Sequence, residues 1–326
     1  MAPMTRRQFT MAAALLAAAP AARSQAPADW PNRAIRMLVP FPVGGNSDNL
    51  ARILAERMSA DLGVTIVVDN RAGGTTQIGT ELAANAAPDG YTILLGAGIS
   101  FTVLPNLRRK LPYDLRASFE PLGAIAKYVA VAAVRKSLGV NTLEEFVALA
   151  QRSPGKLMFG SAGLSSFGHI AGEIIKRDAR VDLLHVPYKG SADASQALAA
   201  GQVDLVIDGT TVPLVKSGLA TALFTFDDRR HPELPAVPAI HETSFPLKGP
   251  TGPAWGLFAP HATPKPIVER LVQSLQKVMA EPDTQARLLR ISCSPDWRSP
   301  AGLLQAFDED RRFYAELLPA IGLKPD

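Results

Sequence analysis

Residues 35–62 read IRMLVPFPVGGNSDNLARILAERMSADL, and this stretch decides the fold. Its first seven residues, 35–41, form an apolar run that predicts a β-strand. After the glycine turn, apolar side chains recur at helical spacing and predict an α-helix with one buried face: Leu50, Ile53, Leu54, Met58 and Leu62. A strand that passes through a short turn into a helix is the opening unit of an α/β protein.

The alternation of strands and helices continues along the chain. Further strands are predicted at 65–69, 91–95, 129–134, 157–160, 182–186, 203–208 and 254–259. Helices are predicted at 143–152, 167–177, 265–280 and 300–317, and one between the second and third strands with Ile78, Leu82 and Ala86 on its buried side. Since 326 residues suffice for two domains, we expect two lobes, each a mainly parallel sheet flanked by helices.

Residues 1–26 have the features of an export signal. Arg6 and Arg7 precede an alanine-rich apolar stretch that ends near Ala26, as in a signal peptide of the twin-arginine type. The apolar part, 11–22, is shorter than the roughly 20 residues that cross a bilayer. We therefore expect export to the periplasm, with cleavage near Ala26.

The charge balance gives no sign of a nucleic-acid partner. The sequence has 34 Lys and Arg against 30 Asp and Glu, a formal charge of +4 that falls to about +1 without Arg6, Arg7 and Arg23. No basic run interleaved with aromatic residues occurs in it. Cys293 is the only cysteine, so no intramolecular disulfide can form.

The turn after the first strand is a candidate anion site. Glycine amides and the unpaired N–H groups of a helix start should converge there, beside these residues: Gly44, Gly45, Ser47 and Asp48. The turn lacks the Gly-Lys-Ser/Thr ending of a nucleotide P-loop. A helix cap that binds no ligand is the alternative interpretation.

Residues 160–169, GSAGLSSFGH, repeat this arrangement in the second half of the chain. The candidates here are Ser161, Ala162, Ser166 and His169. Two such helix starts facing each other would hold an anion between them. For His169 the alternative is a core residue with a hydrogen-bond partner. His169 and Glu173 have the i, i+4 spacing of a metal pair, but no third ligand is recognisable, so no metal is expected.

An exported serine hydrolase is the rival function. It would use Ser165 or Ser166 with His169, but the loop lacks the spacing of a nucleophile elbow, and we expect no catalysis. Residues 96–98, GAG, follow a strand without the third glycine of a dinucleotide fingerprint. We therefore expect no cofactor, and we keep Gly98 as a residue of a ligand-facing turn.

Ordered motifs along nearly all of the chain after residue 26 carry a family resemblance. They are IRMLVPFP at 35–42, DNR at 69–71, APDGYT at 87–92, KLPYD at 110–114, PGKL at 154–157, SAG at 161–163, HVPYKG at 185–190, GQVDL at 201–205 and GLFAP at 256–260. In these the chain resembles the solute-binding proteins of tripartite tricarboxylate transporters, the Bug family. The resemblance implies a periplasmic binding protein of type II, with a small carboxylate in the cleft between two lobes and the membrane permease subunits as partners.

A second series of strands and helices starts near Tyr128, and the segment from 254 is expected to return to the first lobe. Lobe 1 would therefore comprise 27–127 and 254–326, and lobe 2 would comprise 128–253. The resemblance assigns positions to the site. The two candidate loops would form the clamps, with Lys189, Gly190 and Asp208 as weaker pocket candidates; a solvated turn is the alternative for 188–190. We expect a monomer. Delivery of the ligand to a membrane sensor is an alternative that the sequence does not separate from transport.

Three apolar residues depart from the usual family pattern. Phe101 and Leu104 stand where many relatives carry His and Asn, and Phe167 stands where a small polar residue is common. Because aromatic faces favour apolar surface and cannot satisfy a polar group, we hypothesise a ligand with an apolar or aromatic body between its polar ends.

Overall fold

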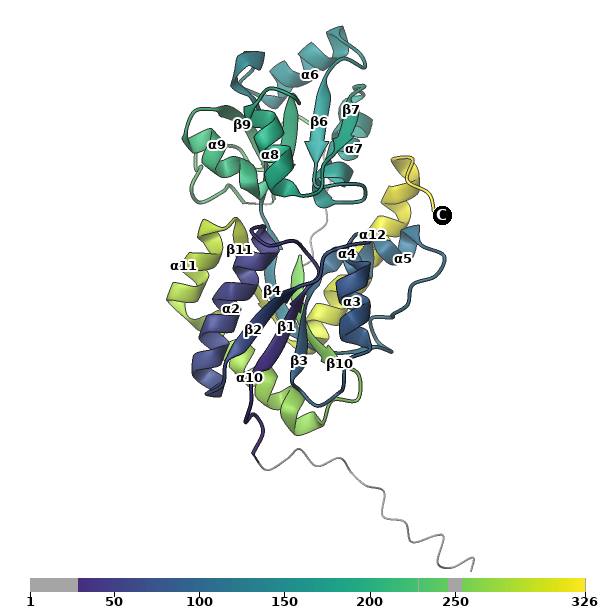
Figure 1. The fold of residues 1–326 in the computed structure, drawn as a ribbon. Coiled ribbons are helices and arrows are strands. Elements are labelled where there is room, and N and C mark those ends of the chain that lie inside the picture. The colour runs from purple at the N-terminus through teal and green to yellow at the C-terminus, as the bar shows by residue number, and fades with distance from the viewer. Residues whose placement is uncertain (1–28, 228, 246–253, 326) are drawn as a thin grey trace, which may run out of the picture.

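The strands form two separate sheets, each belonging to one lobe of the molecule (Figure 1). The computed structural model describes residues 29–227, 229–245 and 254–325, so the predicted export signal lies outside the described residues. Lobe 1 contains β1 (Ile35–Val39), β2 (Ile66–Asn70), β3 (Thr92–Ala97), β4 (Phe119–Tyr128), β10 (Trp255–Pro260) and β11 (Cys293–Arg298), in the order β11-β4-β10-β3-β1-β2. Lobe 2 contains β5 (Ala130–Arg135), β6 (Met158–Ser161), β7 (Leu184–Pro187), β8 (Leu205–Asp208) and β9 (Ala220–Phe226), in the order β7-β6-β8-β5-β9.

Helices cover both faces of the lobe 1 sheet, as Figure 1 shows. One face packs on α2 (Asn46–Leu62), α10 (Lys265–Ala280) and α11 (Pro282–Arg290). The other packs on α3 (Gln77–Ala84), α4 (Gly98–Thr102) and α12 (Pro300–Ala320), with α5 (Leu104–Leu107) beside α12. The strands are therefore buried on both sides, which explains their nearly continuous apolar runs.

In lobe 2 the sheet lies between two pairs of helices. The larger core contains side chains of α6 (Leu143–Arg152) and α7 (Phe167–Ala179), and the smaller one contains side chains of α8 (Ser191–Ala199) with α9 (Val212–Lys216) packed against it. The described part of the lobe also contains the 3₁₀ turns η1 (Lys136–Leu138), η2 (Gly209–Thr211) and η3 (Ile240–Glu242). None of the described helices is long and apolar enough to traverse a lipid bilayer.

Local chemistry sets the ends of the first elements. β1 stops at Val39 because the prolines at 40 and 42 have no N–H for the sheet ladder. α2 ends at Gly63, whose φ of 74° is the left-handed conformation that glycine adopts without strain, and its N–H bonds to the carbonyl of Ser59. In lobe 2, the hydroxyl of Thr142 caps α6 by accepting from the N–H of Glu145.

Both sheets are mixed, and not mainly parallel as predicted. β1, β2 and β3 pair in parallel in lobe 1, and β6, β7 and β8 do so in lobe 2, but β10, β4 and β11 pair antiparallel, as do β5 with β8 and β9. The reason is the connection between the lobes. The chain leaves lobe 1 directly after β4 and returns in β10. β10 lies between β3 and β4 and pairs antiparallel with both, so β10 runs against β1–β3, whereas β4 runs in the same direction as they do.

The predicted buried side of α3 is wrong. Ile78 and Leu82 are 55% and 39% exposed, and the helix instead buries Gly79, Thr80 and Ala83. A Cβ on Gly79 would lie only 2.6 Å from the carbonyl oxygen of Arg71, so the backbone of this short helix rests directly on the neighbouring loop. The close approach, and not the apolar pattern, sets the helix face.

Candidate ligand-binding site

The two predicted loops lie on the sides of the lobes that face each other. The parallel strand β1 leads into the start of α2, and β6 leads into the start of α7. In Figure 1, β6 runs toward lobe 1, and α2 begins at the side of lobe 1 nearest to lobe 2. The geometry therefore places two helix N-termini, both positive ends of helix dipoles, on opposite sides of the space between the lobes.

In the lobe 1 loop, Asp48 organises the backbone. Its Oδ2 accepts a hydrogen bond from the N–H of Gly44 (3.0 Å), and its carboxylate forms an ion pair with Arg52. Burial acts to raise the pKa of Asp48, but Arg52 and the Gly44 N–H outweigh it and hold the pKa below its usual value. The carboxylate is therefore ionised, neutralised within lobe 1, and committed to shaping the turn.

At the start of α2, several backbone N–H groups have no hydrogen-bond acceptor among the described residues. Asn49 N–H bonds to Gly45, but no acceptor among the described residues takes the N–H groups of Gly45, Asn46 or Ser47. The Asn46 side chain is engaged with the carbonyl of Ile291 (2.9 Å). Ser47 is buried, and its Oγ accepts the indole N–H of Trp255 (3.0 Å). The loop thus offers main-chain donors to an anion.

The lobe 2 loop is held by its own serines and by His169. Ser166 Oγ accepts from the N–H of His169 as a helix cap (3.4 Å), and Nδ1 of His169 accepts from the N–H of Ser165 (3.0 Å). Ser165 has a φ of 62°, so this bond fixes a turn in the left-handed region. Because Nδ1 accepts from a backbone N–H, the proton of the neutral His169 ring is on Nε2, and neither nitrogen is left to accept a serine proton as a hydrolase would require.

Ser161 is buried and its hydroxyl is fully engaged. Oγ lies 2.7 Å from Nε2 of His185, donates to the carbonyl of Gly163 (3.0 Å) and accepts from the N–H of Gly163 (3.2 Å). Whichever atom donates in the Ser161–His185 pair, the hydroxyl proton is used inside the protein. Ser161 therefore shapes the loop. The groups of this loop that remain free to donate are backbone N–H groups such as those of Phe167 and Gly168, which have no acceptor in the described part of the chain.

His169 and His185 stack on each other with ring centroids 4.0 Å apart, and Phe159 stacks on His185 at 4.8 Å. Burial lowers the pKa of each imidazole to about 4, helped by Lys176 for His169 and by the neighbouring His169 for His185. Both rings are neutral at pH 7. Across the described ranges there is no group of three or more His, Cys, Asp or Glu side chains that could bind a metal ion.

The remaining candidates have different roles. Gly98 donates its N–H to the carbonyl of Ala254 (2.7 Å), so this amide is already used. Asp208 is buried and accepts from Ser191 Oγ and from both the N–H and the Oγ1 of Thr210. Lys189 is exposed in the turn after β7, and Gly190 is the residue before α8. Lys189 and Gly190 follow the carboxyl end of β7, beside Ser161 at the carboxyl end of β6. The carboxylate of Asp208 already accepts hydrogen bonds within lobe 2.

Two of the three residues behind the apolar-ligand hypothesis lie in the core. Phe101 and Leu104 are 3% and 1% exposed, and Phe101 packs among Tyr113, Phe119, Phe258 and Phe307. Phe101 belongs to the aromatic core between the sheet and α12, and not to either of the two predicted loops. No sequence signal marks this difference, because helical spacing does not distinguish a core face from a cleft face on so short a helix.

No sequence pattern marked Tyr128 or Trp255 as a candidate site residue. His185 was noted only as part of the motif at 185–190. Tyr128 ends β4 where the chain crosses between the lobes, and Trp255 begins β10 where it returns. The aromatic residue at each crossing was the signal that could have found them. Burial and the nearby Asp208 raise the pKa of Tyr128 well above its usual value, so its hydroxyl stays protonated.

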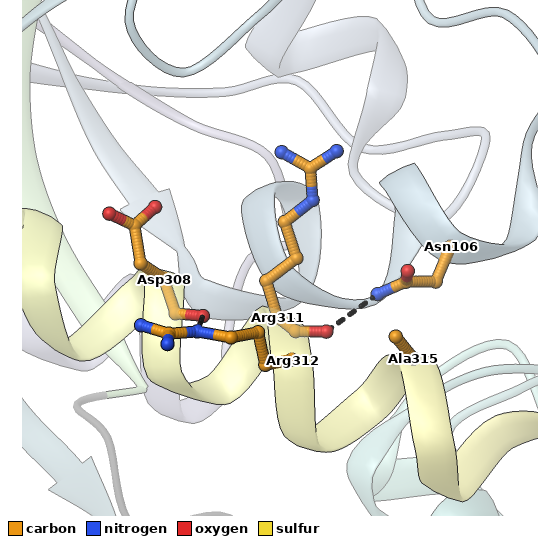
Figure 2. Close-up of a pocket in the computed structure, with 5 residues that line it drawn as sticks. All are labelled: Asn106, Asp308, Arg311, Arg312 and Ala315. Carbon is orange, nitrogen blue, oxygen red and sulfur yellow. Dashed lines mark hydrogen bonds between the residues drawn. The ribbon is translucent and has the colours of Figure 1, made fainter.

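Two cavities lie away from these loops, on the α5–α12 flank of lobe 1. Figure 2 shows the first, about 400 Å³, between Asn106 and the α12 side chains of Asp308, Arg311 and Arg312. Asn106 Nδ2 there donates to the backbone carbonyl of Arg311 (3.1 Å). The second, about 360 Å³, lies between α4, α5 and the loop that follows them. Neither cavity is lined by a predicted site residue.

Comparison with known proteins relates this chain to one family of transport receptors. Residues 50–311 match the model of the tripartite tricarboxylate transporter family receptor. A UPF0065 protein from the tcbD-tcbE intergenic region of Pseudomonas sp. strain P51 is 35% identical over 323 residues, covering 98% of this chain and 95% of that protein.

Two solved structures share the fold over their whole length. Rpa4515 of R. palustris with adipate has a TM-score of 0.85 and 31% identity, covering 91% of this chain and 100% of that one. The periplasmic binding protein BugD has a TM-score of 0.82 and 34% identity, with the same coverage.

Proposed function

The chain belongs to the tripartite tricarboxylate transporter receptor family, whose members are solute-binding receptors and not enzymes, and on that premise we propose that it captures a small organic carboxylate in the periplasm for a membrane permease. The observation that carries the proposal is the pair of opposed helix starts, α2 and α7, with unpaired backbone N–H groups. The relative Rpa4515, solved with adipate, supports a carboxylate as the ligand class.

Backbone donors would bind the carboxylate without a formal countercharge. Neither 41–49 nor 160–168 contains Lys or Arg, and the one carboxylate in these loops, Asp48, is neutralised by Arg52. Main-chain N–H groups at a helix start are fixed in direction by the helix, so little ordering is required when the anion arrives. A carboxylate ligand whose polar groups contact both helix starts stabilises the arrangement in which the lobes enclose it.

The proposed site comprises residues from both lobes with unequal roles. Gly44, Gly45, Ser47, Ala162 and Gly190 would lie against the ligand, with Lys189 at its edge. Asp48, Ser161, Ser166 and His169 would hold the two loops in shape. Gly98 and Asp208 would act behind the site, through bonds to Ala254 and to Ser191.

A matched pair of substitutions at each loop tests the two-sided grip. Gly45→Asp and Ala162→Asp each add a negative charge beside the N–H groups, whereas Gly45→Asn and Ala162→Asn add nearly the same shape without charge. A Cβ at Gly45 has no neighbour closer than 4.0 Å, so either side chain fits there. By calorimetry with adipate and other organic acids, each Asp variant should lose about tenfold more affinity than its Asn partner. Equal loss in the two variants, or no binding of any carboxylate by the unchanged protein, would refute the proposal.

The finer assignments are part of the same proposal. Residues 1–26 would form a twin-arginine signal peptide removed near Ala26, and the receptor would act as a monomer. Lobe 1 would comprise 27–127 with 254–326, and lobe 2 would comprise 128–253. Light scattering on the purified protein tests the monomer, and N-terminal sequencing of the exported protein tests the cleavage site.

A further inference from the structure

Three aromatic side chains form a continuous strip where the lobes join. The Tyr128 ring meets Trp255 edge-on at 5.6 Å between centroids (86°), and it meets Phe167 edge-on at 5.5 Å (80°). Phe167 is held in turn by Phe226 at 5.4 Å. Trp255 is 5% exposed, while Tyr128 and Phe167 are half-buried. We call Tyr128, Phe167 and Trp255 the aromatic strip.

The two ends of the strip coincide with the two helix starts. At one end, the indole N–H of Trp255 donates to Oγ of Ser47, the second residue of α2. At the other end, Phe167 is itself the first residue of α7. The strip therefore spans the interval between the two sets of backbone donors proposed to bind carboxylate oxygens.

The polar groups of the strip are already satisfied within the protein. The Trp255 N–H is used by Ser47, and the hydroxyl oxygen of Tyr128 accepts the N–H of Gly209 (2.8 Å). The proton of the Tyr128 hydroxyl is directed to the carboxylate of Asp208. Phe167 has no polar atom in its side chain. What remains for a ligand is ring surface, which gains from contact with hydrocarbon and offers no partner to a hydroxyl group.

We propose that the aromatic strip is the apolar floor of the ligand site, and that it selects carboxylates with a hydrocarbon body over hydroxylated carboxylates of the same length. The inference rests on the proposed function, because it takes the two helix starts as the carboxylate sites. A ligand hydroxyl laid on the strip would give up its bonds to water without replacement, whereas a methylene group would bury apolar area there. The strip thus selects the middle part of the ligand, and the two helix starts bind its carboxylate ends.

Adipate and galactarate form a matched pair of probes. Both are six-carbon dicarboxylates, and galactarate carries a hydroxyl on each of the four carbons that are methylenes in adipate. Calorimetry on the purified protein should show adipate binding at least about tenfold more tightly, since its methylenes gain from burial on the rings and the hydroxyls of galactarate lose their bonds to water there. Phe167→Ser should reduce this preference about fivefold or more by weakening adipate, while Phe167→Leu, which keeps an apolar side chain and the packing on Phe226, should retain most of it.

Leu164→Ser is the control, because Leu164 is an apolar residue of the same loop that is 63% exposed and lies outside the strip. It should leave the adipate-to-galactarate ratio unchanged. Galactarate binding as tightly as adipate, or Phe167→Ser and Leu164→Ser changing the ratio equally, overturns the inference while carboxylate binding itself stands. Failure of adipate, galactarate and every other organic acid to bind overturns the proposed function as well.

Discussion

Ser292 of lobe 1 donates a hydrogen bond from its Oγ to the backbone carbonyl of Gly209 in lobe 2, at 3.2 Å. Nε2 of His231 lies 3.2 Å from the same Oγ, and the N–H of Gly209 bonds to Tyr128. A Cβ on Gly209 would lie 2.7 Å from Cβ of Ser292 and 3.0 Å from Nδ2 of Asn46. The lobes therefore touch at this point through the backbone of Gly209 and the side chain of Ser292. The contact lies next to Tyr128, at the end of the strand that leads from one lobe to the other.

Gly209→Ala should destabilise the protein, because the added methyl group overlaps Ser292 and pushes against Asn46. Overpacking of this kind costs about 1–3 kcal/mol of unfolding free energy. Urea unfolding monitored by circular dichroism measures the change. An unchanged midpoint would contradict the prediction, because it would mean that the lobes can move apart at this contact at no cost in unfolding free energy.

Ser161→Ala should also destabilise the protein, since it leaves Nε2 of His185 and both backbone groups of Gly163 without their shared hydroxyl partner. A buried polar group left unpaired costs about 1–3 kcal/mol. Ser217→Ala is the control, because that serine is exposed and its Oγ bonds only to the carbonyl of Leu214. If the two variants unfold at the same urea concentration, the hydroxyl of Ser161 does not order the loop.

The stacked imidazoles should make the protein less stable as the pH falls from about 6.5 to about 4. The pKa of His169 and of His185 is about 4 in the folded state, against 6.5 for an ordinary histidine, so only the unfolded chain takes up protons in this window. The charged groups beside the pair are Glu173 and Lys176, which bond to each other. We expect a loss of about 1–3 kcal/mol across the window.

Denaturant titrations at several pH values between 7 and 4.5 measure this loss. His169→Gln should flatten the pH dependence by removing one titrating ring. His231 also has a lowered pKa through burial and contributes in the same direction, so the slope should decrease without vanishing. Carboxylates such as Asp61, with a pKa of about 2, are paired and lose their contribution only at lower pH. A stability that is constant from pH 6.5 to 4.5 would contradict the prediction.

Changing both Arg6 and Arg7 to Lys should leave the precursor in the cytoplasm, because the paired arginines are the part of the proposed signal that the export machinery reads. Immunoblots of periplasmic and cytoplasmic fractions give the distribution. A double variant of Lys136 and Lys156 to Arg, far from the leader, controls for expression. Normal export of the Arg6/Arg7 variant would exclude the twin-arginine assignment.

Much of the secondary structure was predictable because its signals are local. The helices predicted at 143–152 and 265–280 have those same bounds in the structure, since apolar spacing and end residues act over a few turns. β4, β9, β11 and α11 were missed. β11 contains Pro295 and charged residues and is mostly half-buried at the sheet edge, so it lacks an apolar run. Strand direction was misjudged because it depends on where the chain crosses between lobes.

The sequence by itself determined the α/β class and the two glycine-containing loops that each precede a helix. Both follow from local patterns, because apolar periodicity and the residue types at a helix start involve only neighbouring residues. Only the tertiary structure decided which side chains of the candidate site are free. Asp48, Ser161 and Asp208 are engaged by Arg52, His185 and Ser191, and Trp255 reaches Ser47 across 208 positions of sequence. Hydrogen-bond partners and ring contacts depend on distances in space between residues far apart in the chain, and no local pattern encodes them.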